Sequence, residues 1–233
     1  MALAFALLYE GCGAPTRFYA ERPRQPKDVL QRLIDLAAQI DGYRMNATLM
    51  LTVDDKQLQI PLKITFASPN SYSIVAIGPL GMKIARIEVE GDSYTVSLPQ
   101  MGQTLEGTLD DALTLPGAAF EFPNMRDLIA ALSPYPVLRT AERWLIDESS
   151  SMEAGRLILK RPTDDWECDL GFTVEPFQVY RETWRREGRL ILQRLFQYRG
   201  EDDSLPDRIT IRIEDRELAV DIEDLDVQWR VGA

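Results

Sequence analysis

Apolar and polar residues alternate along most of this chain, with the two-residue period of strands that bury one face. The alternation is longest in residues 43–53 and 58–66, which we expect to form one long hairpin. Shorter alternating runs follow, strands are expected to resume from about Arg143 after the middle of the chain, and in all we expect roughly eleven to thirteen strands. The shorter runs lie at 72–77, 82–90, 94–98, 166–174, 190–198, 209–213 and 218–222.

Two segments have the helical period instead. In residues 26–40 apolar side chains recur at every third or fourth position, and Gly42 is expected to end this helix. Asn124 is a suitable cap for a short second helix, residues 125–132, which keeps its apolar side chains on one face. Residues 103–124 contain several Gly and Pro, so we expect mostly loop there.

The order of these segments decides the fold class. Strands follow one another across short turns, which excludes alternating strand–helix–strand units and favours an antiparallel sheet. A sheet with this many strands must curl or close to bury its apolar face. We therefore predict a mainly β protein, an unclosed antiparallel β-barrel with an N-terminal helix and a short mid-chain lid helix. Residues 26–233 are expected to form this one domain.

The first residues predict export and a lipid anchor. Residues 1–8 are apolar but far too short to span a bilayer, which takes about 20 residues, and they suit a signal peptide. Cys12 follows a glycine, an order that resembles a bacterial lipobox, in which the cysteine is acylated. We expect a signal-peptide-like segment at 1–11, a lipidated Cys12 and a tether at 12–25. Two alternatives stay open, an ordinary cysteine and a disulfide with Cys168.

Composition narrows the classes of function. The net charge is −11 and the isoelectric point about 4.6, which argues against nucleic acid and against a polybasic membrane contact. The chain has no histidine and two cysteines, which excludes Ser-His-Asp catalysis and leaves a zinc site short of ligands. We predict no enzyme, no catalytic residue, no metal site and no cofactor. A carboxylate pair among the 37 acidic residues is the remaining catalytic alternative.

The layout of the chain resembles a known family. The order of its elements is similar to that of the LolA/LolB-like superfamily. This order is a helix, a long run of strands, a Pro-rich middle with a short helix, and a second run of strands. Members of the superfamily are the periplasmic carrier and the outer-membrane receptor of lipoproteins, and the likeness is closer to the receptor. The local match is Ile-Gly-Pro-Leu-Gly at residues 77–81, because receptor-type members carry a similar Pro-Leu-Gly loop. The resemblance implies helices that cover an apolar cavity, and a leucine, here Leu80, that contacts the membrane.

The resemblance also implies partners and a location. Acyl chains of lipoproteins, or of another lipid, would occupy the cavity, and a periplasmic carrier protein would deliver them. An anchor at Cys12 would hold the protein on the outer membrane, facing the periplasm. The expected function is therefore to shelter acyl chains and to receive or insert lipoproteins at that membrane. The alternative is an envelope scaffold with the same fold that binds a partner without transferring lipid.

The candidate lipid-binding residues lie on the apolar faces of the strands and the lid helix. A curved sheet has more apolar face than two short helices cover, which favours a cavity. Every candidate also suits an ordinary core position. The candidates are Leu49, Leu51, Ile60, Leu62, Phe66, Ile74, Leu98, Met125, Leu128, Trp166, Phe172, Leu192 and Phe196.

Three other features have simpler interpretations. Cys168 falls on the apolar face of its strand and is expected to be a small core residue. Residues 181–187 mix charges of both signs with a tryptophan, and we interpret them as a solvated strand end. The acidic residues within 221–226 are expected to form a charged sheet edge that discourages pairing with other chains.

Overall fold

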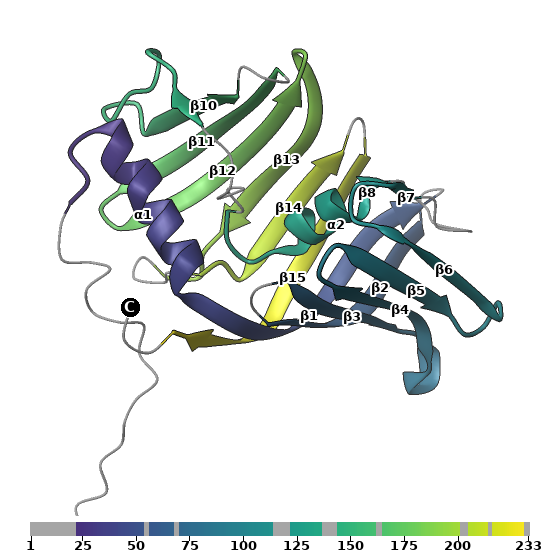
Figure 1. Ribbon diagram of the computed structural model, residues 1–233. Helices are drawn as coiled ribbons and strands as arrows, with labels where there is room; N and C mark the ends of the chain where they lie inside the picture. Colours follow the sequence, from purple (N-terminus) through teal and green to yellow (C-terminus); the bar gives the residue numbers. More distant parts are fainter. Residues whose placement is uncertain are drawn as a thin grey trace, which may run out of the picture.

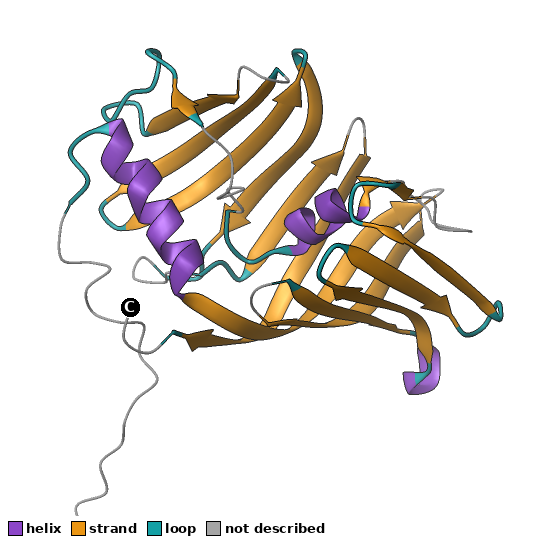
Figure 2. Ribbon diagram, viewed as in Figure 1, coloured by secondary structure: helices purple, strands orange, loops and turns teal. Residues whose placement is uncertain are grey.

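One curved antiparallel sheet forms the body of the protein in this computed structural model (Figures 1 and 2). Within the described residues this sheet has thirteen strands, and its two outermost strands do not pair with each other. The prediction of a mainly β protein with an unclosed antiparallel sheet is confirmed, and the size of the sheet agrees with the number of strands expected from alternation. The structure describes residues 22–53, 56–67, 70–113, 122–136, 144–161, 165–200, 205–213 and 216–230.

The strands form two meanders, one before and one after the middle of the chain. The first consists of β1 (Ile40–Val53), β2 (Lys56–Ala67), β3 (Ser71–Ile77), β4 (Lys83–Glu90), β5 (Ser93–Leu98) and β6 (Gln103–Thr108). The second consists of β9 (Leu145–Ile146), β10 (Arg156–Arg161), β11 (Trp166–Val174), β12 (Phe177–Arg186), β13 (Arg189–Gln197), β14 (Arg208–Ile213) and β15 (Arg216–Trp229). A separate small sheet pairs β7 (Ala112–Leu113) with β8 (Phe122–Asn124).

The pairing of β1 with β15 joins the two meanders into one sheet. These are the longest strands, 14 residues each, and their register runs from Ile40 opposite Trp229 to Leu51 opposite Leu218. The strand order is β6-β5-β4-β3-β2-β1-β15-β14-β13-β12-β11-β10-β9, so β6 and β9 are the two edges. The apolar faces of both meanders therefore form one continuous concave surface.

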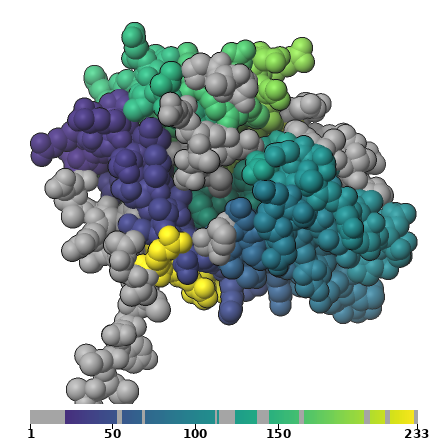
Figure 3. Space-filling model, viewed as in Figure 1, coloured from purple at the N-terminus to yellow at the C-terminus, as the bar shows by residue number. Residues whose placement is uncertain are grey.

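Two α-helices lie on the concave side of the sheet (Figures 1 and 2). Helix α1 (Pro26–Gln39) begins at a proline, buries Val29 and Leu33, and crosses the end of the sheet where β11 meets β12. There the Arg32 guanidinium lies 4.6 Å from the centre of the Phe177 ring. Helix α2 (Met125–Leu132) lies over the middle of the sheet. The surface is recessed between α1 and the lobe that β2–β6 form (Figure 3).

The alternation that predicts the strands also predicts which face is buried. Along β2, Leu62, Ile64 and Phe66 are buried while their neighbours are exposed. The expected hairpin of β1 and β2 is confirmed, with Tyr43 opposite Phe66 and Leu51 opposite Leu58. In the described part of the chain, neither helix has the length and hydropathy that crossing a membrane requires.

Two expectations about element boundaries are wrong. The first helix ends at Gln39, and Gly42 lies inside β1, where a Cβ would stand 2.7 Å from the carbonyl oxygen of Phe66. Gly42 is thus explained by the close approach of two strands, a use of glycine that a helix end can mimic in sequence. Residues 103–108, expected as loop, form β6. This strand depends on its hydrogen bonds to β5, and such pairing cannot be predicted from the local sequence.

The close approach at Gly42 gives a stability prediction. We expect Gly42→Ala to lower the free energy of unfolding by about 2–3 kcal/mol, because the added methyl group meets backbone that cannot move without separating β1 from β2. Thr65→Ala, on the exposed face of the same strand pair, is the control and should cost under about 1 kcal/mol. Urea unfolding of both variants measures the difference, and equal stabilities would contradict the packing described.

Candidate functional site

The predicted lipid-binding side chains all belong to one apolar cluster on the concave side. Ten of them are buried, and Ile60, Leu98 and Trp166 are partly buried against the same cluster. The members come from both meanders and from α2, so the cluster extends across the β1–β15 pairing. The structure therefore brings the candidates together, as residues of one apolar core that also includes Met125 and Leu128 of α2.

Helix α2 is itself buried within this concave side. Six of its eight residues are buried, and Met125 has no exposed surface (0%). Asn124 caps the helix as expected, with its Oδ1 accepting a hydrogen bond from the Asp127 N–H at 2.8 Å. An ion pair of 2.8 Å between Arg126 and Asp110 ties the start of the helix to the turn after β6. Polar contacts thus fix the first turn while the apolar side chains face the sheet.

The segment that leaves α2 is held by a buried arginine from the sheet. Arg194 of β13 donates from Nη1 to the Ser133 carbonyl oxygen at 2.9 Å and from Nη2 to the Tyr135 carbonyl oxygen at 3.2 Å. Its guanidinium also lies 4.9 Å from the centre of the Phe196 ring, one of the predicted lipid-binding side chains. Arg194 therefore bridges the apolar wall of the sheet and the backbone that follows the lid helix.

A buried glutamate balances the charge of this arginine. Glu182 of β12 lies directly opposite Arg194 in the strand register, the two side chains form an ion pair, and neither has exposed surface (0% each). The Trp184 indole Nε1 donates to the other carboxylate oxygen at 2.7 Å. Burial raises the pKa of Glu182, and the nearby Arg194 and Trp184 oppose that rise. Charge pairing and hydrogen bonds together make this polar cluster tolerable inside an apolar face.

An aromatic cluster lies beside the arginine and supports the same segment. The ring of Tyr135, from the segment after α2, meets Tyr43 of β1 edge-on at 6.0 Å between ring centres. Phe66 lies 5.4 Å from Tyr43 and 4.6 Å from Tyr72. Burial raises the pKa of the Tyr135 hydroxyl to about 12, so it stays a neutral donor at physiological pH. The exit of α2 is therefore packed by rings and bonded by Arg194.

The sequence interpretation missed the Arg194–Glu182 pair, although a signal for it is present. Leu192, Arg194 and Phe196 occupy successive same-face positions of one strand, so the alternation places the arginine on the buried face. The expectation that residues 181–187 form a solvated strand end is wrong in the same region, because Glu182 and Trp184 are buried. A charge on the apolar face of an alternating strand was the clue to a functional or structural polar site.

The acidic residues of the last strand do not lie on a sheet edge as expected. β15 is an interior strand, between β14 and β1. Its acidic side chains pair across its outer face, where Asp221 meets Arg208 at 3.2 Å and Glu223 accepts a hydrogen bond from Thr48 at 2.6 Å. They therefore belong to the solvated face of the strand that joins the two meanders.

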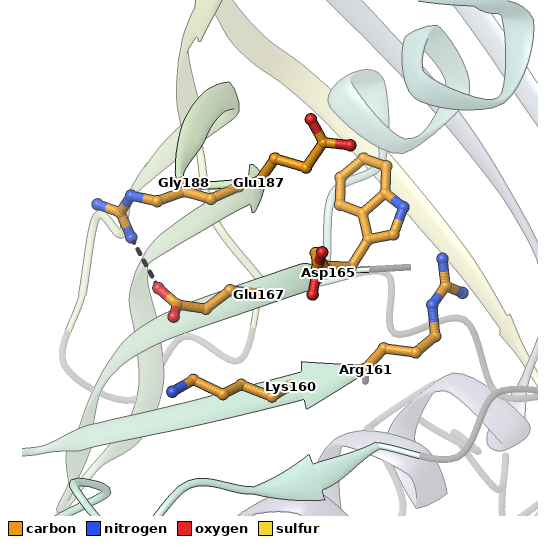
Figure 4. Close-up of a pocket in the computed structure, with 8 residues that line it drawn as sticks. Lys160, Arg161, Asp165, Glu167, Glu187 and Gly188 are labelled. Atoms are coloured by element: carbon orange, nitrogen blue, oxygen red, sulfur yellow. Dashed lines mark hydrogen bonds and ion pairs between the residues drawn. The ribbon is translucent and has the colours of Figure 1, made fainter. Parts of the chain in front are cut away.

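One pocket of about 440 Å³ lies at the hairpin ends of β10–β13, beside the edge of the apolar cluster (Figure 4). Its lining is charged, and Arg185 forms an ion pair of 3.3 Å with Glu167, which Figure 4 labels among the lining residues. Charges of both signs make it unsuitable for an acyl chain, even though the predicted candidate Trp166 contributes one wall. The lining residues are Lys160, Arg161, Asp165, Trp166, Glu167, Arg185, Glu187 and Gly188.

Leu80 lies at a hairpin tip and touches almost nothing. It is 97% exposed, in the short 3-10 turn η2 (Pro79–Gly81) between β3 and β4. Its φ of 61° is in the left-handed region, which an L-residue other than Gly, Asn or Asp seldom adopts. A bulky apolar side chain in a strained, solvent-facing position is a feature that folding alone does not explain.

Of the two cysteines, Cys168 lies within the described residues and Cys12 does not. Cys168 is a free thiol on β11 with no exposed surface (0%), which agrees with the expected small core residue. Burial raises its pKa, so the thiol is unreactive as well as inaccessible. Cys12, the predicted lipidation site, lies outside the described residues.

Comparison with known proteins gives likenesses in structure and none in sequence. No family model matches the chain, and no curated protein matches it. A DUF1329 family protein from Desulfovibrio piger has a TM-score of 0.61 at 13% identity, covering 89% of this chain and 93% of that one. A putative outer membrane lipoprotein-sorting protein domain from Vibrio parahaemolyticus has a TM-score of 0.58 at 10% identity, covering 90% and 95%.

A third solved structure is that of a LolA superfamily protein from Nitrosomonas europaea, with a TM-score of 0.53 at 14% identity. The match covers 88% of this chain and 94% of that one. At such identities the likeness concerns the fold and carries no activity with it. The chain thus shares with these proteins the fold of an unclosed antiparallel sheet that carries helices on its concave side.

Proposed function

We propose that this protein shelters acyl chains on its concave apolar face and receives or inserts lipoproteins at the outer membrane. The observation that carries the proposal is the cover of that face. A sheet of thirteen strands is left unclosed, and a helix of eight residues lies at its middle in place of further strands. If an acyl chain displaced α2, each methylene group that it buries on the apolar face would contribute about 0.8 kcal/mol of favourable free energy. This gain would offset the loss of the contacts of α2.

The likeness to solved structures supports this proposal. Two of the similar proteins are named as a lipoprotein-sorting protein domain and as a LolA superfamily member, and each match covers most of both chains.

An anchor on Cys12 would complete the arrangement by holding the protein at the membrane. Cells that express the full chain should incorporate labelled palmitate into it, and the Cys12→Ser variant should carry no label. Label on that variant would contradict acylation of Cys12.

In this proposal the structure represents the closed state, in which α2 covers the apolar face. We call the hydrogen bonds from Arg194 to the segment after α2 the latch. Arg194 holds the exit of α2 by hydrogen bonds to two carbonyl groups, and these require a defined distance and direction. When the segment moves away, both bonds are lost together, whereas apolar contacts weaken gradually. The latch therefore favours two discrete positions of α2, closed over the sheet or displaced by an acyl chain.

Substitution of the buried pair tests the latch. Arg194→Met leaves Glu182 buried without a partner and should lower the free energy of unfolding by about 3–5 kcal/mol. The double variant Arg194→Met with Glu182→Leu removes both charges and should restore most of that stability. It also frees the Ser133 and Tyr135 carbonyl groups, so we expect it to take up a fluorescent fatty acid faster than the parent. Urea unfolding and stopped-flow fluorescence measure the two effects, and unchanged uptake by a stable double variant would contradict the latch.

Native mass spectrometry of the full chain tests lipid binding itself. The purified protein should retain a fatty acid or lipopeptide, because dissociating an acyl chain re-exposes its methylene groups to water. The matched control is the parent protein after delipidation, which should bind added lipopeptide again. Absence of bound acyl chain before and after that addition would contradict the proposed function.

Leu80→Glu separates delivery from binding. The side chain is 97% exposed and remote from the apolar cluster, so acyl-chain binding should stay unchanged. Transfer of lipoprotein to membranes should fail, because a carboxylate at the tip opposes insertion into lipid. An assay with acylated cargo and acceptor vesicles measures the transfer. Normal delivery by this variant would remove Leu80 from the mechanism.

A second candidate function is an envelope scaffold, and the burial of α2 favours it. In the described residues the helix already covers the middle of the apolar face, as a permanent plug would. A scaffold needs no movement of α2 and binds no acyl chain. The native mass spectrometry above therefore distinguishes the two functions.

A further inference from the structure

Two neighbouring hairpin tips lie together at one end of the sheet. β3 and β5 run in the same direction within the meander, so the β3–β4 and β5–β6 connections leave the same end, as Figure 1 shows. The strands in between set the two tips about 10 Å apart. A flat partner that touches one tip can therefore touch the other.

The two tips are similar in sequence. Each has a proline, then a long apolar side chain directly before a glycine with positive φ: Pro79, Leu80 and Gly81 (φ 77°) in one, and Pro99, Met101 and Gly102 (φ 61°) in the other, where one further residue follows the proline. The second tip is closed by hydrogen bonds from Met101 N to Leu98 O at 3.0 Å and from Gly102 N to Pro99 O at 3.3 Å. Tight turns of this kind hold a side chain outward at little further cost in conformational entropy.

The apolar side chains at these tips have little of their surface buried. Leu80 is 97% exposed, Met82 51% and Met101 52%. These three make up half of the exposed large hydrophobic side chains among the described residues, and they come from two adjacent hairpins. Such a concentration marks a contact surface, where single exposed apolar residues would not. We call these three residues the apolar tips.

Within β3–β6 and their connections, charge is separated toward the end opposite the apolar tips. Residues 77–84 and 97–104, which contain the apolar tips, hold no acidic residue and one cation, Lys83. Glu88, Glu90 and Glu106 lie in β4 and β6 farther from the tips, and Asp92, Asp110 and Asp111 lie in the connections at the opposite end. In a chain of net charge −11, this leaves the tips as a surface that an anionic partner does not repel.

We propose that Met101 and the β5–β6 turn form a second point of contact with lipid beside Leu80, so that the apolar tips together dock on an anionic bilayer. The proposal rests on the proposed function, since lipid delivery is what such docking would serve. Apolar side chains without acidic neighbours suit a surface that is anionic outside and hydrocarbon inside. Two contacts also fix the orientation of the sheet on the membrane, which a single leucine leaves free to rotate.

The test measures vesicle binding by the full chain carrying Cys12→Ser, so that no acyl anchor contributes. With vesicles of phosphatidylcholine and phosphatidylglycerol, Met101→Ser and Leu80→Ser should each lower the partition coefficient on the order of tenfold. Leu145→Ser is the matched control, because Leu145 is 57% exposed on β9 at the far edge of the sheet, and its binding should equal that of the parent. Equal binding by Met101→Ser and the parent would overturn the proposal.

The cation gives a second, independent arm. Lys83→Gln should lower binding about fivefold on vesicles containing phosphatidylglycerol and leave binding to pure phosphatidylcholine unchanged. Lys27→Gln on α1 is its control and should have no effect. Sedimentation velocity measures self-association of the same proteins. If Met101→Ser binds vesicles as the parent does but no longer self-associates, the proposal is overturned in favour of a contact between two copies of the chain.

Fatty-acid binding by the same proteins separates this inference from the proposed function. Met101→Ser should bind fatty acid as the parent does, because Met101 is not part of the apolar cluster. Weak vesicle binding with intact fatty-acid binding therefore supports the apolar tips. A parent protein that binds no fatty acid would contradict the proposed function, whatever the vesicles show.

Discussion

The guanidinium of Arg194, buried in the apolar wall of a curved sheet, organises the concave side of this protein. Four polar groups and one aromatic ring are arranged around it: the carboxylate of Glu182, the indole N–H of Trp184 behind that carboxylate, two backbone carbonyl groups after α2, and the Phe196 ring. A charge in this place costs several kcal/mol unless it is paired and hydrogen-bonded. The position of the segment after α2 is therefore coupled to the integrity of β12 and β13.

This arrangement places a polar, directional contact where a filled core would need only apolar side chains. Replacement of a buried ion pair by apolar residues is often neutral or stabilising, so stability alone gives little reason to keep one. The proposed movement of α2 between two positions would supply a reason, because hydrogen bonds to carbonyl groups are either made or lost. The unclosed sheet makes such a switch feasible, since the cover over its apolar face is a short helix and its exit segment.

Much of the fold could be predicted because the physical rule behind it is local. A strand with one buried face alternates apolar and polar residues, and β1, β2 and β11 show that pattern plainly. β6 does not, because Gln103–Thr108 carries a single large apolar residue and depends on its neighbour β5. The apolar candidates were found together for the same local reason.

The polar part of the site was missed, although the same rule places Arg194 on the buried face. Glu182 and Arg194 are residue types that usually lie on the surface, and the local sequence does not show the pairing across two strands that makes their burial tolerable. Gly42 misled in a similar way, since a glycine after a helical run serves equally at a helix end or at a close strand contact. Leu80 was the exception, because glycine and proline on either side fix an exposed tip without help from distant residues.

The pairing of β1 with β15 has a consequence for how the chain acquires its structure. The bond between Arg230 and Asp41 spans 189 positions, so one edge of β1 stays open until the last strand has been synthesised. Contacts of such long range slow folding and leave strand edges available for aggregation in the meantime. A product truncated before residue 216 would keep β1 as a bare edge permanently, which makes the C-terminal strand the step that commits the whole sheet to its native topology.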